Sequence, residues 1–157
     1  MKKESIKKGH ILQRKGDLNS KVYKVESGLL RGYTIDEKGK EHIFMFAPEN
    51  WVIGDNVSAH APADLFIEAL EDSIIITHAK DLDKHTPAIH ALVNRLEVLQ
   101  KRVIMLMSAT ALERYDHFVE TYPKLLQRVP QRLIASYLGI TPEAISKAKG
   151  DRLRAQK

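Results

Sequence analysis

The 157-residue sequence predicts an α+β protein in which an antiparallel β jelly roll is followed by a long helix and a tight corner of two short helices. Glycine is the first indication, because five of the eight glycines lie in the first 40 residues and none occurs between Gly54 and Gly139. Hydrophobic periodicity is the second, because apolar residues alternate in the first half and recur every three or four residues from Pro87 onward. Short strands joined by frequent turns are therefore expected first, and uninterrupted helices after them.

Short strands are predicted over residues 22–26, 29–35, 41–46, 51–53, 65–70 and 73–78. The segment Asp36-Glu37-Lys38-Gly39 is the expected hairpin turn between the second and third strands, since Gly can adopt a positive φ. Strands that recur about every ten residues indicate a small antiparallel barrel or jelly roll.

One long helix is predicted after Pro87. Its apolar residues follow a heptad repeat, with Ile89, Leu96 and Val103 at a positions and Leu92, Leu99 and Leu106 at d positions. This distribution favours a parallel two-stranded coiled coil, so these six residues are the expected dimer interface. Packing of the helix on its own barrel is the alternative, and both can hold if the helix uses two faces.

A two-helix corner is predicted over residues 130–149. Pro130 suits the first turn of a helix, and Gly139 can adopt the left-handed conformation that ends it. Thr141 then caps a second helix whose first residue is Pro142, and Ile145 returns to the core. The outward positions are Pro142, Glu143, Ser146, Lys147 and Lys149. A helix that reads a DNA groove needs such a face, and a plain helical hairpin is the alternative.

Charge is distributed unevenly along the chain, whose formal net charge is +5. Residues 124–157 hold eight basic and two acidic residues, a net charge of +6. Residues 41–77 hold seven acidic residues and neither Lys nor Arg. A basic tail suits a polyanion such as nucleic acid, and a solvated basic surface is the equally weighted alternative.

Composition narrows the class of protein further. With 43% hydrophobic and 29% charged residues, and apolar runs far below the roughly 18 residues of a membrane span, the chain is typical of a globular protein. The absence of cysteine excludes disulfides, thiol catalysis, Cys-ligated zinc and iron–sulfur clusters. No apolar export signal follows Met1, so a cytoplasmic location is expected.

Five segments of the first half carry a recognisable pattern: Lys8-Gly9-His10-Ile11-Leu12, Lys15-Gly16-Asp17, Val25-Glu26-Ser27-Gly28, Lys38-Gly39 and Trp51-Val52-Ile53-Gly54-Asp55. Followed by the long helix and the corner, they resemble the cyclic-AMP receptor/FNR (CRP/FNR) superfamily of bacterial transcription regulators. The resemblance implies a sensory jelly roll over 1–85, a dimerisation helix over 86–111 and a helix-turn-helix DNA-binding domain over 112–157. It also implies a homodimer on a palindromic operator in double-stranded DNA, with half-sites about 34–36 Å apart.

The resemblance assigns residues to two sites. On DNA it implies that Glu143 and Lys147 contact base edges in the major groove, with Ser146 on the same face. Gln131, Thr141 and Lys149 are then the expected phosphate contacts. In the barrel it implies a pocket for an unidentified small-molecule effector, formed by Gly54, Asp55, Asn56, Asp64 and Leu65.

The chain departs from the family pattern in two places. Where nucleotide-binding members carry an Arg for the cyclic phosphate, this chain has Asp64, whose charge repels phosphate. We therefore expect no binding of cyclic AMP or cyclic GMP in the usual way, unless Arg14, Arg31 or Lys101 supplies the cation. Gly150 is unfavourable inside a helix, so the second helix of the corner is expected to stop at Lys149. Only residues 150–157 follow, too few for the paired strands of a full wing.

Other functions are weighed against this one. The seven His are scattered without a His-x-His pair, and neither a nucleophile elbow nor a Walker loop is present, so we expect no enzyme, metal or cofactor. The stronger rival is a dimeric interaction or small-molecule-sensing protein whose helix-turn-helix no longer reads DNA.

Overall fold

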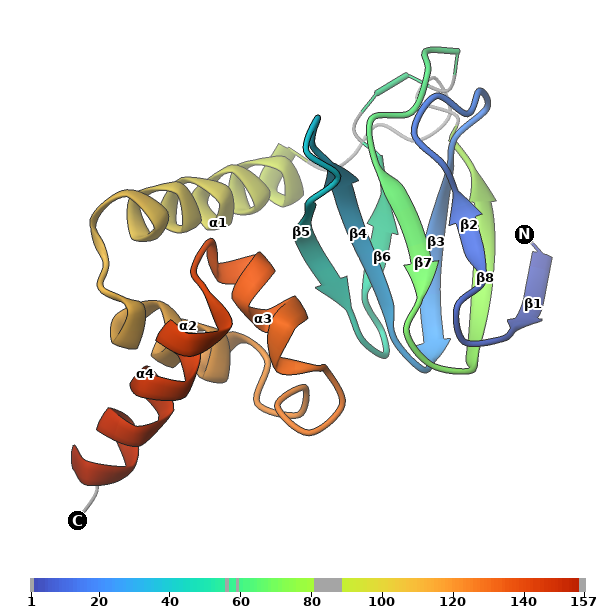
Figure 1. Ribbon diagram of the computed structural model, residues 1–157. Coiled ribbons are helices and arrows are strands. Elements are labelled where there is room, and N and C mark those ends of the chain that lie inside the picture. Colours follow the sequence, from blue (N-terminus) through green and yellow to red (C-terminus); the bar gives the residue numbers. More distant parts are fainter. Residues whose placement is uncertain (1, 56, 59, 81–88, 156–157) are drawn as a thin grey trace. The chain divides into compact units, whose positions relative to one another are not determined.

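A computed structural model of the protein describes residues 2–55, 57–58, 60–80 and 89–155. The chain divides into two compact units, Met1–His85 and Thr86–Lys157. Figure 1 shows that the first unit is built from strands and the second from helices. None of the described helices is both long and apolar enough to cross a bilayer.

The described residues of the first unit form two four-stranded antiparallel sheets. One sheet has the order β1 (Lys2–Ile6), β8 (Ser73–Ala79), β3 (Lys21–Ser27) and β6 (Val52–Gly54). The other has the order β2 (Ile11–Gln13), β7 (Phe66–Ala69), β4 (Leu30–Ile35) and β5 (Glu41–Ala47). Most neighbours in these sheets are distant in sequence, as in a jelly roll.

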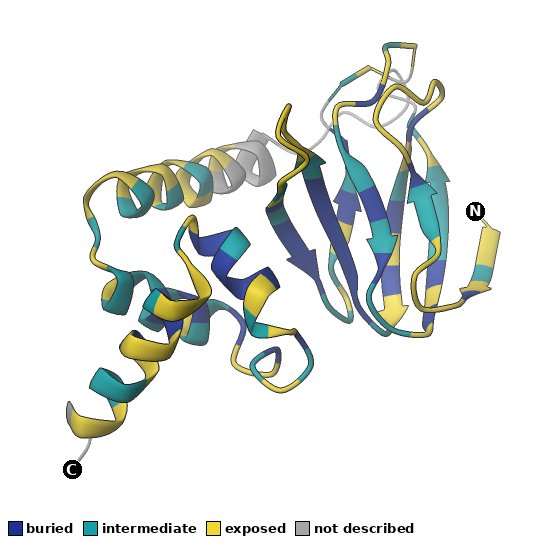
Figure 2. Cartoon of the chain, in the orientation of Figure 1, coloured by how far each residue is buried: buried dark blue, intermediate teal, exposed yellow. Residues whose placement is uncertain are grey.

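Alternation along the strands builds the core of this unit. In β3, Tyr23 and Val25 are buried while Lys24 between them is exposed. Their partners in the core come from both sheets and include Leu30, Ile53, Ile67 and Ile75. Figure 2 shows this buried layer in dark blue along β4 and β5.

The predicted strands agree with β3 to β8 to within two residues at each end. The hairpin also forms as expected, with the N–H of Gly39 donating to the carbonyl of Asp36 (3.0 Å) and a φ of +77° at Gly39. The structure adds β1 and β2, which the alternation did not predict. β1 carries one buried apolar residue, Ile6, and forms because it pairs with β8.

The second unit contains four helices over its described residues, 89–155: α1 (Ile89–Ser108), α2 (Ala111–Thr121), α3 (Gln131–Leu138) and α4 (Pro142–Ala155). Sequence periodicity did not predict α2 as a separate helix. It begins at a capping box, in which the Thr110 hydroxyl accepts from the N–H of Glu113 (3.3 Å) and the Glu113 carboxylate accepts from the N–H of Thr110 (2.7 Å). Phe118 of α2 packs with Tyr122 and Tyr137, with ring centroids 5.4–5.7 Å apart.

The expectation that the last helix stops at Lys149 is wrong. α4 continues through Gly150 to Ala155. Arg152 explains part of this extension, because its guanidinium pairs with Asp116 of α2 at 2.7 Å and ties the last turns of α4 to that helix. Arg152 and Arg154 also lie in the last turn, where positive charge is favourable to the helix dipole.

Candidate nucleic-acid interface and effector pocket

The turn between α3 and α4 has the geometry that its sequence predicts. Gly139 ends α3 in the left-handed conformation with φ +65° and ψ +31°, and the N–H of Ile140 donates to the carbonyl of Ala135 (3.1 Å). The hydroxyl of Thr141 accepts from the N–H of Ala144 (3.2 Å) and so caps α4. Ile145 is fully buried and anchors the second helix.

Gln131 connects the first turns of the two helices. Its side-chain Nε2 donates to the carbonyl of Pro142 (2.9 Å) and to the hydroxyl of Ser146 (2.7 Å). Ser146 in turn donates to the same carbonyl of Pro142 (3.2 Å). Gln131 and Ser146, both expected on the DNA-binding surface, therefore also fix the angle of the corner, a role that their sequence positions do not reveal.

The remaining expected DNA contacts on α4 are exposed, but only Glu143 and Lys147, four residues apart, share one side of the helix; Lys149 follows Lys147 by two residues and lies nearly opposite it. Glu143, Lys147 and Lys149 are exposed, whereas Ile145 and Ala148 of the same helix are buried. Figure 2 shows exposed positions along the length of this helix. The pKa of Glu143 lies below its usual value, because a backbone N–H and Thr141 hydrogen-bond to its carboxylate, so Glu143 is ionised at neutral pH.

Arg154 extends this exposed side beyond the expected residues. It follows Lys147 by seven residues and Glu143 by eleven, which places all three on one side of the helix. Its side chain is 79% exposed. The prediction that the helix ends at Lys149 hid this position, although the excess of basic residues near the C-terminus was visible in the sequence.

Two arginines join α1 and α2 to the corner. The guanidinium of Arg114 in α2 donates to three carbonyls: Leu106 (2.7 Å), Ala109 (3.0 Å) and Leu138 (3.2 Å). Arg102 of α1 donates to the carbonyl of Tyr137 (3.3 Å), and its guanidinium lies 4.1 Å from the centre of the Tyr137 ring. The end of α1, the start of α2 and the end of α3 are thus fastened to one another.

The expected dimer interface on α1 is partly exposed. Leu96 is 67% exposed and Val103 is 54% exposed, whereas Leu99 and Leu106 are half-buried. Ile89 and Leu92 belong to the same prediction, but their side chains lie outside the described part of the chain. Four further apolar side chains are exposed on the described part of α1 and widen the apolar surface: Val93, Val98, Ile104 and Met107.

In the expected effector pocket, the carboxylate of Asp55 turns inward. It is 5% exposed and accepts from the N–H groups of Val57 (3.1 Å), Asp64 (2.6 Å) and Leu65 (2.9 Å). Burial acts to raise the pKa of Asp55, but these N–H groups outweigh it, so the pKa lies below its usual value. Asp55 therefore holds the base of the loop, while Asn56 of the same prediction lies outside the described residues.

The basic side chains that could supply a cation to this pocket differ in their contacts. Arg31 is 7% exposed and pairs with Glu41 and with Glu68 (2.7 Å). Lys101 pairs with Glu97 of its own helix at 2.6 Å, and Arg14 is exposed. Lys80, which no local pattern marks, donates to the carbonyl of Val57 (2.6 Å) and interacts with Asp55; burial lowers its pKa.

Comparison with known proteins shows the family to which this chain belongs. A family model described as the cyclic nucleotide-binding domain matches residues 3–81. The Fumarate and nitrate reduction regulatory protein of Escherichia coli K12 is 30% identical over 174 residues, covering 95% of this chain and 68% of that protein. This chain belongs to the CRP/FNR family of transcription regulators.

Other CRP/FNR comparisons agree. The Anaerobic regulatory protein of Haemophilus influenzae is 26% identical over 169 residues, covering 95% of this chain and 66% of that protein. The chain therefore spans about two thirds of the length of these curated relatives. The structure of FixK2 from Bradyrhizobium japonicum matches with a TM-score of 0.81 and 21% identity over 99% of this chain and 85% of that one. A CRP/FNR regulator from Thermus thermophilus matches with a TM-score of 0.73 and 18% identity, over 98% of this chain and 87% of that one.

The described residues of this CRP/FNR chain bear on two kinds of ligand site, one for a metal ion and one for a cyclic phosphate. Within the described ranges, no group of three or more His, Asp or Glu side chains is placed to hold a metal ion. The expected phosphate site holds an acidic residue, Asp64, whose backbone N–H is already bonded to Asp55.

Proposed function

We propose that this chain is a dimeric transcription regulator of the CRP/FNR type that binds double-stranded DNA through α4. The observation that carries the proposal is the corner itself: Gly139 and Thr141 set a tight turn, Gln131 fixes its angle, and the exposed side of α4 carries Glu143 and Lys147. Such a helix inserts its N-terminal residues into the major groove.

Within this proposal the exposed residues of α4 divide by role. Glu143 accepts from cytosine N4, and Lys147 donates to guanine O6 or N7, so these two read the sequence. Lys149 and Thr141 contact phosphates and set the register. The side chain of Gln131 already donates two hydrogen bonds to α4, so its contact with phosphate is limited. Its main role is to position Ser146.

We propose that the partner in the dimer is a second copy of this chain, joined through α1. Leu96 and Val103 are seven residues apart and more than half exposed, the spacing at which two parallel helices meet. Burying such side chains against a copy removes apolar surface from water at about 25 cal/mol per Å². Ile89, Leu92, Leu99 and Leu106 complete the proposed seam, and the two copies place two α4 helices on a palindromic site.

We propose further that the sensory unit does not bind cyclic AMP or cyclic GMP in the usual way. The inward Asp55, the acidic Asp64 and the engagement of Arg31 by Glu41 and Glu68 support this. Micromolar binding of either nucleotide in calorimetry would contradict it.

Selection of duplexes from a random DNA library by the wild-type protein tests the DNA-binding proposal. We expect a palindromic consensus whose half-site centres lie about 34–36 Å apart. Lys147→Ala should weaken binding to the selected duplex by roughly 5-fold to 150-fold, the effect of one base contact of about 1–3 kcal/mol, and should leave the sedimentation coefficient of the dimer unchanged.

Two matched variants sharpen this test. Lys24→Ala removes an exposed lysine of β3 and should leave the affinity for the selected duplex unchanged. Lys149→Ala should weaken binding to selected and unrelated duplexes alike and reduce the salt slope by about 1. Binding that depends on salt but selects no consensus would refute sequence reading and favour the dimeric interaction protein.

A further inference from the structure

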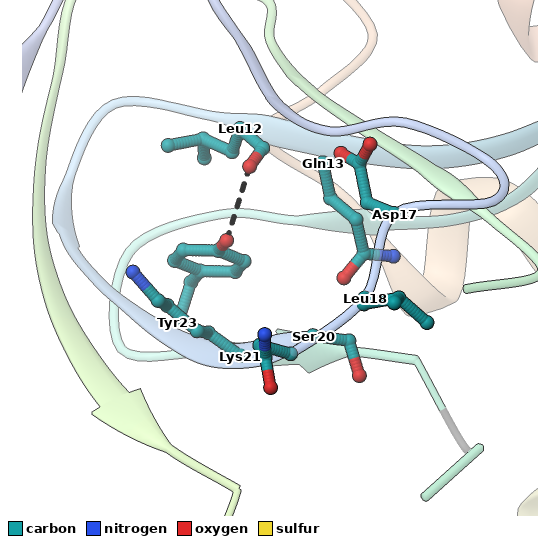
Figure 3. Close-up of a pocket in the computed structure, with 8 residues that line it drawn as sticks. Leu12, Gln13, Asp17, Leu18, Ser20, Lys21 and Tyr23 are labelled. Carbon is teal, nitrogen blue, oxygen red and sulfur yellow. Dashed lines mark hydrogen bonds between the residues drawn. The ribbon is translucent and has the colours of Figure 1, made fainter. Parts of the chain in front are cut away.

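A surface hollow of about 240 Å³ lies where β2 leads into β3 (Figure 3). It is lined by Leu12, Gln13, Asp17, Leu18, Asn19, Ser20, Lys21 and Tyr23. A cavity of about 150 Å³ suffices for benzene, so this hollow has room for a molecule built on one ring. None of its lining residues belongs to the expected pocket around Asp55.

Gln13 gives the hollow an unmet hydrogen-bond acceptor. The residue is 2% exposed, and its Nε2 donates to the carbonyl of Leu65 (2.8 Å) and, at 3.4 Å, to Asp55. Two acceptors on that side fix the orientation of the amide, so Oε1 must face the other way. Among the described residues, Oε1 is the one buried side-chain polar atom without a hydrogen-bond partner. Figure 3 shows this oxygen pointing among the side chains that line the hollow.

An unsatisfied buried acceptor destabilises the folded protein, so we expect Oε1 of Gln13 to have a hydrogen-bond donor as its partner. Tyr23 does not supply one, because its hydroxyl donates to the carbonyl of Leu12 (3.2 Å). Burial raises the pKa of Tyr23 to about 12, so that hydroxyl stays protonated at neutral pH. Because Oε1 itself is fully buried, the partner that fits it is a donor that enters the hollow and moves a lining side chain aside.

The lining selects the chemistry of the entering molecule. Asp17 and Lys21 are both exposed at the hollow and carry opposite charges, so neither an anion nor a cation is favoured overall. Leu12, Leu18 and the ring of Tyr23 supply apolar surface. Leu18 is 61% exposed, so rotating its side chain to admit a ligand gives up little buried area.

Two hydrogen-bonded bridges link the hollow to the loop that begins at Asp55. Gln13 forms the first bridge through Leu65. Lys80 forms the second, because its Nζ donates both to Ser20 in the hollow (3.1 Å) and to the carbonyl of Val57 in the loop (2.6 Å). A molecule in the hollow therefore touches Gln13, which is bonded to Leu65, and Ser20, which is bonded to Lys80.

We propose that the hollow binds a small uncharged molecule that has an apolar ring and an N–H or O–H group donating to Gln13 Oε1. The hollow shares no lining residue with the expected effector pocket around Asp55 and does not depend on DNA binding, so the site goes beyond the proposed function.

Benzamide and methyl benzoate form a matched pair of probes, because they share a ring and a carbonyl and only benzamide has a donor. In ¹⁵N-labelled full-length protein, benzamide should shift the backbone amide signals of residues 12–23 in a saturable way. Methyl benzoate should bind about tenfold more weakly, the upper end of what one neutral hydrogen bond contributes. Equal binding of the two probes, or no shift with benzamide, would overturn the proposal.

Variants tie the binding to this hollow. Gln13→Met removes the acceptor and should reduce benzamide binding to the level of methyl benzoate. Because Gln13 also anchors Leu65, Leu18→Trp provides a second route that fills the hollow from an exposed position and should abolish binding. Leu153→Trp, at a position that is 64% exposed on α4, is the control and should bind benzamide as the wild type does. Unchanged binding in Leu18→Trp, or a crystal soaked in benzamide with an ordered water only at Oε1, would refute the assignment.

Discussion

Replacement of Arg114 by Gln tests whether one side chain fastens α1, α2 and α3 together. The guanidinium donates to the carbonyls of Leu106, Ala109 and Leu138 at 2.7–3.2 Å. Leu106 and Leu138 lie in the last turns of α1 and α3, where carbonyls have no donor within their own helix. Glutamine is shorter and reaches at most one of the three.

The size of the loss follows from these contacts. A hydrogen bond to a charged group contributes about 1.5–3 kcal/mol when buried, and Arg114 is half-buried, so water replaces part of what is lost. We expect Arg114→Gln to lower the free energy of unfolding by about 2–4 kcal/mol. Arg132→Gln changes an exposed arginine of α3 and should stay within about 0.5 kcal/mol of the wild type.

Urea unfolding followed by circular dichroism at 222 nm measures this difference, because the signal reports mainly the helices. Arg114→Lys keeps the charge but replaces the planar fork with a single ammonium, so it should recover only part of the loss. If Arg114→Gln unfolds at the same urea concentration as Arg132→Gln, the three bonds do not stabilise the unit and the reasoning is refuted.

Two further predictions concern the effects of Asp55 and Gly150 on the stability of the fold. Because the folded-state pKa of Asp55 lies below its unfolded value of 3.8, Asp55 stabilises the fold above that pH and the contribution disappears as pH falls through the folded pKa. Urea midpoints at pH 6 and pH 3 should therefore differ more for the wild type than for Asp55→Asn, and equal differences would argue against this role. Gly150 lies inside α4 without a positive φ, and an added Cβ would meet only Arg154 at 3.6 Å. Gly150→Ala should thus raise the free energy of unfolding by roughly 0.5–1 kcal/mol in urea titrations, and a loss of stability would mean that this helix needs the glycine.

Local patterns predicted the elements whose residues repeat with a regular period. The alternation that predicted β3 and the heptad spacing that predicted α1 are both properties of a few neighbouring residues. β1 escaped prediction because four of its five residues are not buried, and its pairing with β8 joins residues some 70 positions apart, beginning with Lys2 opposite Thr77. The extension of α4 past Gly150 depends on Asp116 in another helix, which no window of sequence contains.

The candidate site likewise has features that the sequence could predict and contacts that it could not. The exposed side of α4 follows from helical spacing, so Glu143 and Lys147 could be placed from the sequence. The bonds from Gln131 to α4 and from Lys80 to Val57 could not, because each depends on side-chain reach between segments brought together by folding. The inward turn of Asp55 was hidden for the same reason, since its backbone partners at Asp64 and Leu65 lie nine and ten residues ahead.

Three arginines of the helical unit join its helices to one another. Arg102, Arg114 and Arg152 each bind a partner within the same unit, Thr86–Lys157. The angle between α1, the proposed dimer helix, and α4, the proposed DNA-contacting helix, is therefore held by residues of that stretch of sequence. On the proposed function, a chimera that joins a foreign barrel to this unit should therefore keep the spacing of its DNA half-sites.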